Sequence, residues 1–106
     1  MKGQSVYKEP GGKLVRVSLE EEHGKISSVK VSGDFFMHPE EGIGILEERL
    51  EGKRVDPVIL EREIRGALEA ASVKAFGISP AGLAKAIAMA SENGKRGAGA
   101  GGACDG

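Results

Sequence analysis

The chain has 106 residues, of which 40% are hydrophobic and 29% are charged, and its net charge is −1. This balance is typical of one small globular domain, and the near-neutral charge gives no reason to expect nucleic acid or an anionic membrane as a partner. No apolar run approaches the roughly 20 residues of a membrane span, and the N-terminus lacks the apolar core of a signal peptide. We therefore expect a cytoplasmic protein.

The first half of the chain predicts an antiparallel hairpin. Residues 1–12 form a polar N-terminal segment that ends in a turn at Pro10–Gly12. Hydrophobic and polar residues then alternate over 13–20 and again over 26–33, as expected for two strands with one buried face. The three glutamates at 20–22 are expected in an exposed turn. We expect a small antiparallel sheet of two or three strands.

Three helices are predicted after the hairpin, over residues 39–51, 57–71 and 80–92. The second and third begin alike, because Asp56 and Ser79 are good N-caps and each precedes a proline that suits the first helical position. Gly94 is expected to end the third helix. The connector between these two helices contains Phe76, which we expect in the core. The fold class is therefore α+β, with a small antiparallel sheet packed against three helices.

The last residues differ from the rest of the chain in composition. Residues 94–106 are mostly Gly and Ala, which predicts a flexible tail after a domain over 13–93. The stretch "GAGAGG" formally matches a dinucleotide-binding pattern, but no strand precedes it as that motif requires. Cys104 lies in this tail and is interpreted as an incidental thiol, because a cysteine nucleophile needs a neighbouring base and a rigid pocket.

No catalytic or metal site is predicted. His23, His38 and Cys104 do not have the spacing of metal ligands. Glu40 and Glu41 are interpreted as acidic residues in the first turn of a helix, where the helix dipole favours negative charge, and not as a catalytic carboxylate pair. From its residues alone, the chain is interpreted as a small interaction domain.

The adjacent residues Phe35 and Phe36 raise a question, because neighbours on a strand point to opposite faces. Val29, Val31 and Phe35 share the apolar face, so a continuous strand would place Phe36 on the polar face, where an aromatic side chain is a candidate anchor for a partner. Alternatively, the strand breaks at Gly33 and the first helix covers both rings. The residues alone leave these two interpretations open.

The order of several short motifs resembles the accessory domain of lipoate–protein ligases. The stretches that carry the resemblance are "GGKLVRVSLEEEHGKISSVKVSGDFF", Pro39, "LEERLEGKRV" and a last helix that follows "IS". It covers roughly residues 10–90. In that family the domain is either the C-terminal part of one chain or a separate small subunit, and a chain that starts at Met1 resembles the separate subunit.

The resemblance implies a non-catalytic subunit that works with a catalytic subunit as a heterodimer. ATP, Mg and lipoate would be bound by the complex and not by this chain alone, and the subunit would be needed chiefly for converting lipoate to lipoyl-AMP. Lipoyl-acceptor domains would be indirect partners. The expected contacts with the catalytic subunit are Lys13, Gly33, Asp34, Phe36 and His38.

Two other functions remain open from the sequence. Small α+β domains also serve as sulfur acceptors or iron–sulfur scaffolds, but these need a reactive cysteine or several cysteine ligands in a structured region. The other alternative is a free-standing regulatory interaction domain.

Overall fold

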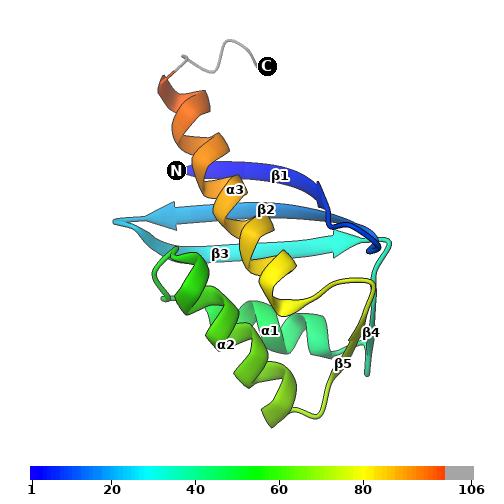
Figure 1. Cartoon of the computed structure of the whole chain (residues 1–106). Coiled ribbons are helices and arrows are strands. Elements are labelled where there is room, and N and C mark those ends of the chain that lie inside the picture. Colours follow the sequence, from blue (N-terminus) through cyan, green and yellow to red (C-terminus); the bar gives the residue numbers. More distant parts are fainter. Residues whose placement is uncertain (100–106) are drawn as a thin grey trace.

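The computed structural model describes residues 1–99, which form a three-stranded antiparallel sheet, a separate two-stranded ribbon and three helices (Figure 1). The sheet has the order β1-β2-β3 and consists of Lys2–Lys8, Leu14–Glu22 and Lys25–Gly33. The ribbon consists of β4, Phe36–His38, and β5, Lys74–Phe76. The helices are α1, Gly42–Leu50, α2, Pro57–Ala70, and α3, Pro80–Gly99. The α+β prediction is confirmed.

The β2–β3 hairpin follows the alternation in the sequence. Val17 pairs with Val31 and Leu19 with Val29, and all four side chains are buried on the inner face. The three glutamates were wrongly predicted to form an exposed turn, because β2 continues through Glu22. A bulge between Glu20 and Glu21 changes the register there, and the buried Glu21 carboxylate accepts a 2.6 Å hydrogen bond from Ser91 Oγ of α3.

The third strand of the sheet comes from the N-terminal segment. Lys2–Lys8 pairs with β2 along its whole length, from Lys2 opposite Glu20 to Lys8 opposite Leu14. Its inward side chains are small or amphipathic, and Ser5 donates a 2.7 Å hydrogen bond to the Ala86 carbonyl of α3. Few inward residues of β1 are hydrophobic, so the sequence pattern for this strand is weak.

The helices begin and end close to the predicted residues, with two differences. Asp56 caps α2 as predicted, since its Oδ1 accepts hydrogen bonds from the amides of Val58 and Ile59. The first helix begins at Gly42 and not near Pro39, because the chain is still part of the ribbon at His38 and then makes a turn. The third helix runs past Gly94 to Gly99.

Gly94 allows a close approach between α3 and β1. A Cβ atom at this position would lie 2.6 Å from the carbonyl oxygen of Lys2, so no larger residue fits without moving the strand. The predicted flexible tail is therefore helical over its first residues. The rest of it, including the part of "GAGAGG" from Ala100 onward and Cys104, lies outside the described residues.

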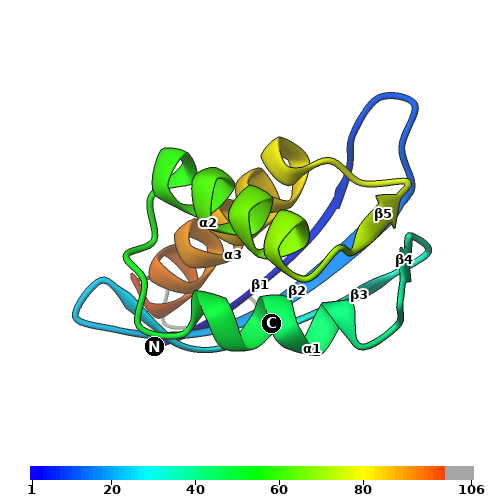
Figure 2. The ribbon, with the colours of Figure 1, turned by 90° about the horizontal axis from the view of Figure 1, so that it is seen from below.

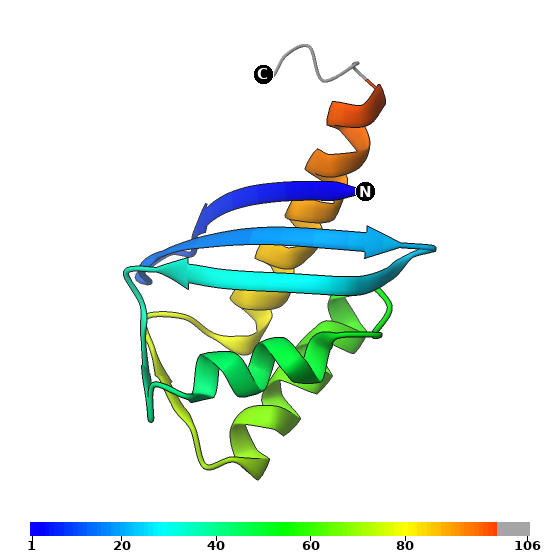
Figure 3. The ribbon, with the colours of Figure 1, turned by 180° about the vertical axis from the view of Figure 1, so that it is seen from behind.

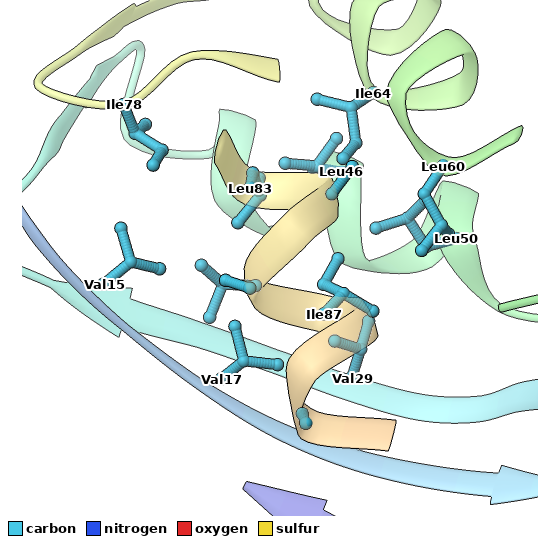
Figure 4. Close-up of a cluster of buried hydrophobic side chains, with 14 of the residues drawn as sticks. Val15, Val17, Val29, Leu46, Leu50, Leu60, Ile64, Ile78, Leu83 and Ile87 are labelled. Carbon is cyan, nitrogen blue, oxygen red and sulfur yellow. The ribbon is translucent and has the colours of Figure 1, made fainter. Parts of the chain in front are cut away.

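The core lies between the sheet and the helices (Figure 4). α3 crosses the inner face of the sheet against β1 and β2, α1 packs beside β3, and α2 packs against α1 and α3 (Figure 2). Leu46, Leu60, Ile64, Leu83 and Ile87 are among the fully buried residues. Burial of these side chains provides the main driving force for folding. Within residues 1–99, no helix is both long and apolar enough to cross a membrane.

Candidate functional site

The β4–β5 ribbon projects from one end of the main sheet (Figure 1). Phe36 pairs with Phe76, Met37 with Ala75 and His38 with Lys74. Met37 is buried, whereas both residues of the first and last pairs are exposed. We call these four exposed side chains, Phe36, His38, Lys74 and Phe76, the ribbon surface.

Two aromatic rings lie exposed together on the ribbon surface. Phe36 and Phe76 have exposed fractions of 52% and 51%, and their ring centroids are 5.8 Å apart. The prediction that Phe76 lies in the core is therefore wrong. Its ring pairs across the ribbon with another exposed ring instead of packing inward. Two clustered exposed aromatic side chains, flanked by polar ones, are typical of a protein-binding surface.

The environments of Phe35 and Phe36 agree with one part of each predicted alternative. The strand β3 does end at Gly33, whose φ of +147° is unfavourable for residues with a side chain. The break does not bury both rings, because Phe35 is only 8% exposed while Phe36 remains exposed. The chain leaves the sheet at Gly33 and re-enters an extended conformation in β4.

The base of the ribbon is tied to the β1–β2 loop. The Lys13 amide donates a 2.7 Å hydrogen bond to the Gly77 carbonyl, next to Phe76. The Asp34 amide donates a 2.9 Å hydrogen bond to the Leu14 carbonyl. The structure therefore brings the five predicted contact residues to one end of the molecule: Gly33 and Asp34 lead into β4, Phe36 and His38 lie on it, and Lys13 lies beside the end of β5.

Glu9 was not among the predicted site residues, yet its side chain connects the β1–β2 loop to the start of α3. One carboxylate oxygen of Glu9 accepts a 2.7 Å hydrogen bond from the Ser79 amide, and the other accepts a 3.0 Å bond from Ser79 Oγ. Ser79 Oγ in turn accepts a bond from the Gly82 amide in the first turn of α3. A negative charge is favourable at a helix N-terminus, so Glu9 joins the β1–β2 loop to α3. Because Glu9 and Ser79 are 70 residues apart, no local motif could indicate this pair.

Two further residues of the ribbon surface, Lys74 and Phe76, were also missing from the predicted contacts. Their strand has only three residues, too few for alternation to be recognised. In the part of the chain that the structure describes, no three His, Cys, Asp or Glu side chains form a group that would hold a metal ion. The ribbon surface is thus suited to protein binding by its aromatic rings and neighbouring polar groups.

Comparison with known protein families identifies the family of this chain. Residues 8–87 match the family described as bacterial lipoate protein ligase C-terminus. The chain belongs to this family. The match covers the sheet from the end of β1 onward, the ribbon, α1, α2 and the first part of α3.

One curated protein and one solved structure, both from Thermoplasma acidophilum, are similar to this ligase C-terminal domain. The lipoate-protein ligase A subunit 2 is 40% identical over 45 residues, which are 42% of this chain and 48% of the relative. The alignment thus spans about half the length of that curated relative. A chain from the structural analysis of an archaeal lipoylation system, a bipartite lipoate protein ligase and its E2 lipoyl domain, superposes with a TM-score of 0.70 at 30% identity. That superposition covers 82% of this chain and 94% of the other.

Proposed function

We propose that this chain is the second, non-catalytic subunit of a two-part lipoate–protein ligase. The observation that carries the proposal is the family membership, since the similar Thermoplasma protein is a subunit 2 and the similar fold comes from a bipartite ligase. Such a subunit pairs with a catalytic subunit that activates lipoate with ATP and transfers the lipoyl group to a lysine of an acceptor protein. Because such a ligase uses ATP and modifies an intracellular acceptor, the proposal includes a cytoplasmic location.

In this proposal the subunit closes the active site of the catalytic subunit and supplies no reacting groups. Forming lipoyl-AMP requires ATP, Mg²⁺ and lipoate to be held in line while water is excluded. A rigid domain that covers the catalytic subunit's pocket supplies that exclusion, and its withdrawal then admits the acceptor. The oxygen ligands for Mg²⁺ would come from the catalytic subunit and the ATP phosphates, as is usual for magnesium–nucleotide sites.

We place the contact with the catalytic subunit at the ribbon surface. The paired rings of Phe36 and Phe76 are exposed on a ribbon held by hydrogen bonds at its base, so they lose little conformational entropy on binding. Aromatic side chains often provide most of the binding energy of an interface. His38 and Lys74, paired on the same ribbon, would form part of its polar rim.

The test uses the purified chain mixed with a lipoate ligase catalytic subunit from the same organism. We expect a stable heterodimer in gel filtration and lipoyl-AMP formation by the mixture. Phe36→Ala and Phe76→Ala should each weaken heterodimer formation by at least about tenfold, because each removes half of the aromatic pair. Val58→Ala, at a 67% exposed apolar residue on α2, is the matched control and should bind normally.

Two results would contradict the proposal. If no complex and no lipoyl-AMP appear with the unmodified chain, the assignment as a ligase subunit fails. If the complex forms but both phenylalanine variants bind as tightly as the control, the ribbon surface is not the contact.

A further inference from the structure

Within residues 1–99, no helix covers the outer face of the three-stranded sheet. Figure 3 shows this face with α3 behind the sheet, while α1 runs beside β3. The alternating side chains of β1, β2 and β3 that do not enter the core point away from it and are exposed. They form a second surface, adjacent to the ribbon end of the sheet and distinct from the ribbon surface.

Charge is distributed unevenly on this face. Toward the β2–β3 turn, the exposed strand residues Glu20 and Glu22 accompany Lys2 and Lys25. The other half, toward the ribbon, has only cations among its charged strand residues. We call this half the basic face and define it by Val6, Lys8, Arg16, Ser18, Lys30 and Ser32.

The centre of the basic face is hollowed around Arg16. The hollow has a volume of about 240 Å³, and Arg16, Lys30 and the two serines are among its lining residues. Arg16 pairs with Ser32 and Lys30 with Ser18, so the two cations are diagonal cross-strand neighbours separated by short side chains. Within residues 1–99, Arg16 forms no salt bridge, and Lys30 has only a 3.9 Å contact with Glu47 while remaining 76% exposed. Both cations are accessible to a carboxylate from another molecule.

We propose that the basic face docks an acidic surface of the lipoyl-acceptor domain. This inference rests on the proposed function, in which the acceptor is the one protein besides the catalytic subunit that must reach the complex. It gives the acceptor a direct contact with this chain, whereas the family resemblance implied only an indirect one. The basic face lies beside the ribbon, so an acceptor domain held there is close to the proposed contact with the catalytic subunit.

The chemistry of the basic face suits a partner that is exchanged in every turnover. Charged surfaces speed association and bind weakly, whereas apolar surfaces favour long-lived complexes. The basic face is almost entirely polar, with Val6 as its one apolar residue, whereas the ribbon surface has two exposed aromatic rings. Arginine also binds carboxylates in a geometrically specific, bidentate way. Nucleic acid is a less suitable partner, because the basic face offers few cations for phosphate contacts and the chain as a whole is slightly acidic.

The test is steady-state lipoylation of an E2 lipoyl domain from the same organism by the reconstituted two-subunit ligase. The double variant Arg16→Glu/Lys30→Glu should raise the KM for the lipoyl domain by about tenfold or more and leave kcat at saturating lipoyl domain unchanged. Raising the salt concentration from about 50 mM to about 500 mM should shrink this difference, because exposed charges are then screened. Formation of lipoyl-AMP without acceptor should be unaffected.

The control variant changes the net charge by the same amount, but on the other half of the same sheet face. Lys2→Glu/Lys25→Glu should raise the KM by less than about threefold, since Glu20 and Glu22 already reduce the positive potential there. An unchanged KM for the basic-face variant overturns the inference, as does an equal increase in both double variants. Loss of lipoyl-AMP formation in the basic-face variant also overturns it, by assigning this face to the catalytic subunit. Failure of the unmodified pair to make lipoyl-AMP removes the proposed function itself.

Discussion

Phe35 and Phe36 are chemically identical neighbours, and the backbone between two sheets determines their different environments. Phe35 follows the break at Gly33 and turns into the core, whereas Phe36 opens β4 and pairs with Phe76. Period-two alternation predicts opposite faces for the two rings. It cannot predict the second aromatic partner, because that partner comes from a strand about 40 residues later in the chain.

Substitution of the two residues should separate stability from binding. Phe35→Ala should lower the free energy of unfolding by about 3–5 kcal/mol, because it leaves a cavity in the core. Phe36→Ala should leave the midpoint of urea unfolding nearly unchanged, because its ring is about half exposed. Urea titrations followed by circular dichroism measure both. Equal destabilisation by the two substitutions would mean that Phe36 supports the fold rather than a partner.

Among the elements, those with strong local signals are the ones that the sequence predicts. The hairpin 13–20/26–33 and the helix beginning at Asp56–Pro57 match β2, β3 and α2 within a few residues. Both kinds of signal, alternation and capping, depend on residues close in sequence. β1, β4 and β5 depend instead on distant partners. Gly94 was misread as a helix end for the same reason, since its role is the close contact with Lys2 of β1.

The contact between Glu9 and Ser79 should control how the β1–β2 loop and the ribbon are held together. Glu9→Ala removes the acceptor of two hydrogen bonds at the start of α3 and should lower the free energy of unfolding by about 1–3 kcal/mol. It should also speed hydrogen exchange of the Ser79 and Lys13 amides, measured by NMR, because the loop is released from α3. The matched control is Glu40→Ala, at an exposed glutamate in a neighbouring loop. Unchanged exchange at both amides in the Glu9 variant would argue against this role.

At the scale of the whole molecule, the two exposed surfaces differ in the way that two different partners would require. The ribbon surface combines aromatic rings with a rigid base, which favours a lasting subunit contact. The basic face is hydrophilic and open, which favours a transient one. Neither surface was recognisable as a unit in the sequence, because each is assembled from strands that are separated along the chain. The family motifs nevertheless mark one of them, since the "GDFF" stretch leads into β4.

The roles of the two subunits can be tested by measuring lipoyl-AMP formation and lipoyl transfer separately. The isolated chain should form no lipoyl-AMP from lipoate and ATP, because we assign the reacting groups to the catalytic subunit, and the mixture of both subunits should form it. When preformed lipoyl-AMP and saturating acceptor are supplied, the catalytic subunit alone should transfer the lipoyl group at nearly the rate of the mixture, because closure over ATP is no longer needed. Pyrophosphate release and mass spectrometry of the acceptor measure the two steps. Adenylation of lipoate by the isolated chain would refute the non-catalytic assignment, and a transfer step that depends on the chain at saturating acceptor would show that its role extends beyond closing the activation site.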